Sequence, residues 1–106
     1  MNLFLLDPSL PGAELVKQGL DDFAQDRETD CSLLLLIAAP RLRALGVAIP
    51  ERTASRPFEH QLYDRLAARL GNDAHSHYNS LIRRIVSYAR ALERERSRSA
   101  NRGSVV

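Results

Sequence analysis

The amino-acid sequence predicts an all-α domain, a small bundle of four to five helices that ends in a long C-terminal helical hairpin. Three observations favour this fold class. Residues 73–94 form the longest uninterrupted helical pattern, and residues 57–70 form a second one that stops at Gly71. The most apolar stretch is rich in leucine and alanine, which favour a helix over a strand.

Length and composition indicate one domain without metal or disulfide support. The 106 residues are 44% hydrophobic, which is enough apolar material for a core. Cys31 is the single cysteine, so an intrachain disulfide is excluded and a reducing, cytoplasmic location is favoured. The apolar run Leu3–Leu6 is too short for a signal peptide. The run Leu33–Ala39 stops at Pro40, well short of the roughly 20 residues of a membrane span, so we expect no membrane segment.

The first helix is expected over about Pro11 to Gln25. Its apolar residues share one face: Leu15, Val16, Gly19, Leu20 and Phe23. Three acids, Asp21, Asp22 and Asp26, lie in its second half, where negative charge opposes the helix dipole. We therefore expect an arginine to pair with this end of the helix.

The second segment, residues 31–46, has a cap at Thr29 or Asp30 and a stop at Gly46. Pro40 predicts either a kink or a break near Ala38 that divides the segment into two helices. The run Leu33–Ile37 is apolar all round, so periodicity alone also allows a strand. The alternative fold is therefore α+β, with Leu3–Leu6 and Leu33–Ile37 paired in a short N-terminal βαβ unit. Residues 47–55 are expected to form a connecting loop.

The last two helices are expected to start at Pro57 and at Asn72 or Asp73, with a very short turn between them. On the second of these helices the apolar residues recur at alternating spacings of about four and three, which is typical of a packing seam. The candidate seam consists of Tyr78, Leu81, Ile82, Ile85, Ala89 and Leu92. Leftover apolar surface on this hairpin predicts a homo-oligomer, most simply a dimer.

The end of this helix is expected at or before Arg96, because an arginine at that position falls on the apolar side of the helix. Beyond it the sequence is polar and without periodicity. We therefore expect a single helical domain over residues 1–96 and a flexible basic tail over residues 97–106.

Charge is distributed unevenly along the chain. Residues 1–30 carry seven acids and two bases, a net charge of −5, whereas residues 83–106 carry seven arginines and two glutamates, a net charge of +5. Four arginines lie on or next to the polar side of the last helix and form a candidate anion or nucleic-acid surface: Arg83, Arg90, Arg94 and Arg98. Because no aromatic residue is interleaved with them, we expect contacts to a nucleic-acid backbone and little sequence specificity.

Catalytic, metal and cofactor sites are not indicated. His75 and His77 are two residues apart on a helix, about 200° around its axis, and cannot converge on one metal ion. Cys31 stands at an expected helix start, where a thiol pKa can be lowered. Arg69 and His75, in RLGNDAH, are similar to the arginine–histidine signature of HEPN ribonucleases, small helical proteins in which this pair handles RNA. Here Gly71 separates the two residues, which departs from that family's helical context.

The sequence therefore predicts a non-catalytic, bacterial-type helical adaptor, regulator or assembly protein that acts through protein–protein contacts, without a cofactor. The alternative is a nucleic-acid-associated protein that uses the arginine surface, with a HEPN-like ribonuclease as its enzymatic extreme. Partners are accordingly a second copy of the chain, another protein or a nucleic acid.

Overall fold

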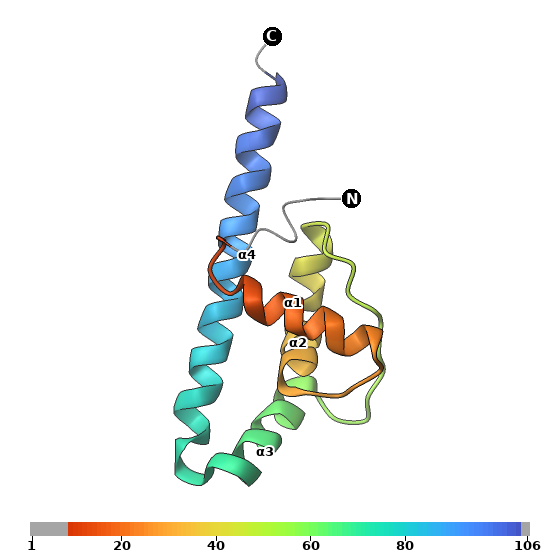
Figure 1. Ribbon diagram of the computed structural model, residues 1–106, viewed down its shortest axis with the longest axis vertical. Coiled ribbons are helices and arrows are strands. Elements are labelled where there is room, and N and C mark those ends of the chain that lie inside the picture. Colours follow the sequence, from red (N-terminus) through yellow and green to blue (C-terminus); the bar gives the residue numbers. More distant parts are fainter. Residues whose placement is uncertain (1–8, 105–106) are drawn as a thin grey trace.

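A computed structural model describes residues 9–104 of the chain and shows four α-helices and one 3-10 turn in that range (Figure 1). The elements are α1 (Ala13–Ala24), α2 (Asp30–Ala44), α3 (Phe58–Leu70), η2 (Gly71–Asp73) and α4 (Ala74–Ser104). The described residues contain no strand, so the all-α prediction is confirmed for them. Within the same range, no helix is long and apolar enough to cross a membrane.

Helix α1 starts two residues later than predicted, because Gly12 serves as its N-cap in a left-handed conformation with φ of 80°. A Cβ atom at Gly12 would lie 2.6 Å from the backbone oxygen of Arg84, so glycine lets α1 begin directly against α4. At Gly19, a Cβ would lie 2.5 Å from Cδ1 of Leu35, which shows that α1 and α2 are also closely packed. Helix α1 is thus held between two neighbours.

Helix α2 is continuous from Asp30 to Ala44, so the helix favoured for Leu33–Ile37 is confirmed and the alternative of a strand there is wrong. A capping box starts the helix, in which Thr29 and Ser32 each accept a hydrogen bond from the other's backbone N–H. Pro40 does not divide the helix, and its side chain is exposed. Buried residues on both sides of it, Ala39 and Leu42, keep the two halves of α2 packed against the core. The proposed strand partner Leu3–Leu6 lies outside the described residues.

The segment between α2 and α3 is the predicted loop, but two of its residues belong to the core. Val47 and Ile49 are 2% and 5% exposed, and Arg43 donates hydrogen bonds to the backbone oxygens of Ile49 and Pro50. These contacts fold the loop back onto the end of α2.

Helix α4 continues to Ser104, so the helix end predicted at Arg96 is wrong. The side chain of Arg96 does not enter the core. Its guanidinium donates a 2.9 Å hydrogen bond to the backbone oxygen of Ala44, a carbonyl in the last turn of α2 that lacks a helical partner. Residues 97–104 of the predicted tail are therefore helical, and their flexibility stays a prediction.

Helices α3 and α4 are consecutive but do not form an isolated hairpin. They diverge from the turn at residues 71–73, α2 runs upward beside α4, and α1 crosses in front (Figure 1). Of the predicted seam, Leu81, Ile85, Ala89 and Leu92 are buried, whereas Tyr78 and Ile82 are half-buried. Three buried α4 residues were absent from the predicted seam: Ala74, Tyr88 and Ala91. Helix α4 therefore packs against three helices over a wider face than its spacing indicated.

Candidate nucleic-acid interface

One side of α4 consists entirely of arginine, serine and asparagine. With 100° per residue, an arc of about 100° between residues 76 and 98 contains no other residue type. We call this surface the arginine face; it comprises Ser76, Asn79, Ser80, Arg83, Ser87, Arg90, Arg94, Ser97 and Arg98. All of these side chains are exposed except Asn79, which is half-buried. At 1.5 Å per residue the face is about 33 Å long.

The four predicted arginines all lie on this face, and within the described residues two of them have no hydrogen-bond or ion-pair partner. Arg83 donates a long, 3.4 Å bond to the backbone oxygen of Asn79, and Arg98 pairs with Glu95 at 3.1 Å. In the part of the chain that the structure describes, Arg90 and Arg94 make no hydrogen bond or ion pair. Their guanidinium groups are therefore available to an external anion.

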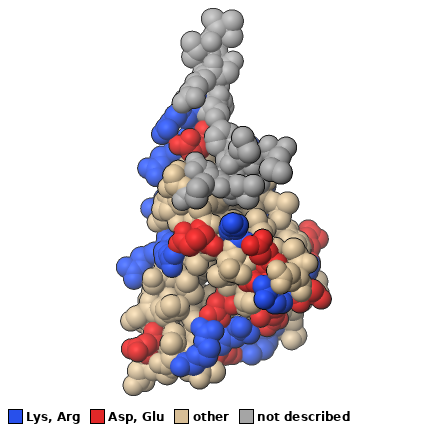
Figure 2. Space-filling view, in the orientation of Figure 1, with Lys and Arg blue, Asp and Glu red and all other residues tan. Residues whose placement is uncertain are grey.

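Of the two glutamates of α4 that flank the arginine face, Glu95 pairs with Arg98 of the face itself, and Glu93 is engaged elsewhere. Glu93 lies next to the face and pairs with Arg41 of α2 at 3.0 Å, and Glu14 of α1 pairs with Arg84. Figure 2 shows basic side chains following one another along the edge of the molecule that α4 forms. The arginine face thus keeps its positive charge along the long axis of the protein.

An aromatic cluster lies at the N-terminal end of α4, beside the arginine face. The ring centroid of Tyr63, on α3, lies 5.6 Å from that of Tyr78 and 6.4 Å from that of His75, both on α4. Tyr63 is 37% exposed and His75 is also exposed. Burial, and secondarily the charge of Glu59, raise the pKa of the Tyr78 phenol, which keeps it neutral. This cluster was not predictable from the sequence, because Tyr63 belongs to α3 whereas His75 and Tyr78 belong to α4.

Arg69 and His75, the HEPN-like pair, have different partners in the structure. Arg69 donates a 2.5 Å hydrogen bond to Asp30, which also accepts a 3.1 Å bond from Arg65. His75 instead contacts Asn79, with 3.2 Å between the side-chain nitrogens, and the ring of Tyr63. Arg69 thus joins α3 to the start of α2, whereas His75 belongs to the aromatic cluster.

Asp22 is the carboxylate for which an arginine partner was expected, and it is 2% exposed. It accepts hydrogen bonds from Thr29 at 2.5 Å, Gln18 at 3.0 Å and Arg27 at 3.1 Å. The hydrogen bond from Thr29, with those from Gln18 and Arg27 and the charge of Arg27, lowers the pKa of Asp22 despite its burial. This group ties the end of α1 to the cap of α2 and has a structural role.

Cys31 does not have the environment of a reactive thiolate. It is half-buried in the first turn of α2, and burial, followed by the charges of Asp22 and Asp30, raises the pKa of its thiol. The lowering that a position at a helix start makes possible is therefore absent at Cys31. Among the described residues, no three His, Cys, Asp or Glu side chains are grouped in a way that could hold a metal ion.

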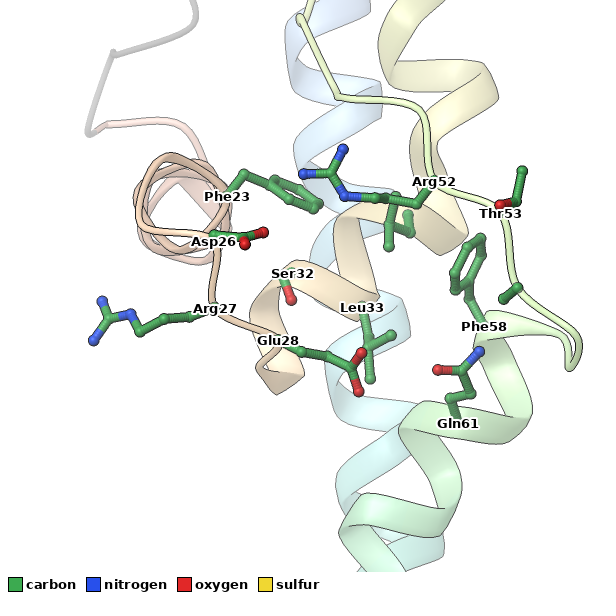
Figure 3. A pocket seen from close by; sticks show the side chains of 12 residues that line it. Phe23, Asp26, Arg27, Glu28, Ser32, Leu33, Arg52, Thr53, Phe58 and Gln61 are labelled. Carbon is green, nitrogen blue, oxygen red and sulfur yellow. The ribbon is translucent and has the colours of Figure 1, made fainter.

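A separate hollow of about 300 Å³ lies between the end of α1, α2, the following loop and the start of α3 (Figure 3). Phe23, Leu33 and Phe58 contribute apolar surface to it, and the guanidinium of Arg52 lies 5.5 Å from the ring centre of Phe23. Glu28 also lines the hollow, so charges of both signs surround it. This mixture indicates no particular ligand.

Comparison with known proteins adds no functional assignment. No protein-family model matches the chain, no curated protein matches it, and no solved structure matches its fold.

Proposed function

We propose that this protein is a non-catalytic nucleic-acid-binding protein that holds the phosphate backbone on the arginine face of α4. The observation that carries the proposal is the composition of that face: over about 33 Å it presents arginine, serine and asparagine and no carboxylate. A cytoplasmic location belongs to the proposal, since the lone Cys31 favours a reducing compartment.

The spacing of the arginines supports a ligand with repeated negative charges. Arg90, Arg94 and Arg98 occupy successive helical turns, about 6 Å apart along the axis. A single small anion would use one or two of these groups, whereas a polyanion uses all of them. Guanidinium, hydroxyl and side-chain amide groups are the donors that proteins commonly direct at phosphate oxygens. A nucleic-acid backbone therefore fits the whole face.

Binding of this kind is strongly dependent on salt. Each phosphate that an arginine neutralises releases counterions, so the logarithm of the binding constant falls with the logarithm of salt concentration by about 0.7–0.9 per contact. Contacts to the backbone alone carry little sequence information. We therefore expect similar affinities for unrelated sequences of equal length.

Replacing Arg90→Ala together with Arg94→Ala tests the proposal, because neither side chain makes a hydrogen bond or ion pair within the described residues. Fluorescence anisotropy with a labelled oligonucleotide between about 50 and about 200 mM salt measures the effect. We expect weaker binding and a salt slope reduced by about 1.4–1.8, which corresponds to two lost contacts.

Arg56→Ala is the matched control, since Arg56 is also an exposed arginine and lies away from the arginine face. Arg56 precedes α3 and pairs with Asp64 of that helix. It should leave both the affinity and the salt slope near those of the unmodified protein. Equal effects of the control and the double variant would contradict the assignment to α4. An unmodified protein that binds no nucleic acid at low salt would refute the function itself.

The second candidate is an adaptor or assembly protein that acts through protein–protein contacts, including a dimer of this chain. Two large apolar side chains of α3 favour it, Tyr63 and Leu70, each 37% exposed. Tyr78, Ile82 and Val86 form a half-buried stripe on the neighbouring helix. Sedimentation at micromolar concentration discriminates the dimer: a mass of twice 11.9 kDa supports it, and a monomer refutes it.

A further inference from the structure

We infer that the ligand is single-stranded, and that Tyr63 and His75 provide a platform on which one of its bases stacks while the arginine face follows its backbone. This inference rests on the proposed function and names the substrate class of the same site. The observation behind it is the position of the aromatic cluster, directly at the N-terminal end of the arginine face.

The aromatic cluster and the arginine face are connected by a series of side-chain contacts. The ring of Tyr63 contacts the ring of His75, and the side chain of His75 contacts that of Asn79 at 3.2 Å. Asn79 in turn accepts the bond from Nε of Arg83 through its backbone oxygen. An exposed aromatic ring is therefore connected, residue by residue, to the first arginine of the face.

The tyrosine ring is both fixed and accessible. Its T-shaped contacts with Tyr78 and His75, each at an interplanar angle of 64°, restrict its orientation. With 37% of Tyr63 exposed, part of the side chain remains open to a ligand. Because the ring is already held, the Tyr63 side chain loses little conformational freedom when a base stacks on it.

A base can reach such a ring when it is not already stacked within a duplex. Proteins that bind single strands combine a cationic track for the backbone with aromatic side chains for the bases, and every base offers a flat face for stacking. In a duplex, the bases are paired and stacked on one another, so Tyr63 would be left without a partner while the arginines still contact phosphates. The geometry therefore favours single strands over duplexes.

The test compares Tyr63→Ala with Tyr63→Phe, which keeps the ring and removes the hydroxyl. Anisotropy is measured with oligodeoxyuridine and oligouridine of about 16 nucleotides, which differ only in the 2′-hydroxyl, and with a duplex of equal length. We expect Tyr63→Ala to weaken single-strand binding by about five- to 150-fold, the range for loss of one stacked base, and to leave duplex binding unchanged. Tyr63→Phe should bind single strands like the unmodified protein.

A second readout does not depend on affinity. The chain has no tryptophan and three tyrosines, so its intrinsic emission comes from tyrosine. Single strands should quench part of this emission, and the quenched part should be absent in Tyr63→Phe although its affinity is retained.

The outcomes separate this inference from the function on which it rests. Tyr63→Ala with an unchanged single-strand affinity, or with equal losses for single strand and duplex, would overturn the stacking platform while leaving backbone binding by α4 intact. Absence of binding to every oligonucleotide would overturn both. The two single-stranded probes show whether the 2′-hydroxyl contributes, and equal affinities are expected because neither stacking nor phosphate contact requires it.

Discussion

Asp22 illustrates how a single carboxylate connects two helices. It lies at 2% exposure and accepts hydrogen bonds from three side chains, of which that of Thr29 belongs to the cap of α2. An arginine partner was expected from the acids at the end of α1, and Arg27 fulfils that expectation for Asp22. The threonine and glutamine partners were not predictable, because they depend on how α1 folds back onto the start of α2.

The lowered pKa of Asp22 predicts a specific pH dependence of stability. A carboxyl group whose pKa is lower in the folded than in the unfolded protein stabilises the fold above its ordinary pKa, and this contribution is lost as the pH falls through the folded value. Asp22→Asn should therefore be less stable than the unmodified protein near pH 6, and the difference should shrink as the pH is lowered below about 4.

Urea denaturation of both proteins across this pH range measures the effect. Asp21→Asn is the control, because Asp21 is an exposed neighbour on the same helix turn. A difference for Asp22→Asn that stays constant down to the lowest pH would contradict the role of its charge.

The contact between Arg96 and α2 explains why helix α4 continues beyond its predicted end at Arg96. The sequence pattern placed a charge on the apolar side of the helix, and the structure shows that α2 ends at this level, where its free carbonyls attract a cation.

Arg96→Ala should therefore lower the free energy of unfolding by about 0.5–1.5 kcal/mol, the usual contribution of one hydrogen bond. Arg94→Ala, two residues away on the exposed face, should change it by less than about 0.5 kcal/mol. Urea unfolding followed by circular dichroism measures both. Equal stabilities of the two variants would show that Arg96 does not hold the end of α2.

The helices themselves were largely predictable from local signals. Thr29 marks the start of α2 and Gly71 marks the end of α3, because capping and left-handed conformations depend on nearby residues. Local signals did not predict the continuity of α2 through Pro40 or the burial of Tyr88. Both depend on packing between segments that are distant in the sequence. The arginine face could be read from helical spacing, whereas the adjacent Tyr63 required the fold.

The whole molecule is elongated, with Cα extents of 55 × 26 × 21 Å, and α4 follows its long axis. Ion pairs such as Glu14–Arg84 and Arg41–Glu93 use part of the uneven charge to hold the helices together. Arg90 and Arg94 are outside these pairs in the described structure, so positive charge remains along the exposed side of α4. We propose that this side of α4 is where a nucleic acid binds.

The most direct test of that claim is a titration of the isotope-labelled protein with a single-stranded oligonucleotide, followed through the backbone amide chemical shifts. We expect the shifts to follow the arginine face from Ser76 to Arg98 and to include Tyr63 on α3. Shifts centred on the hollow beside Phe23 and Phe58, or an absence of shifts along α4, would contradict it.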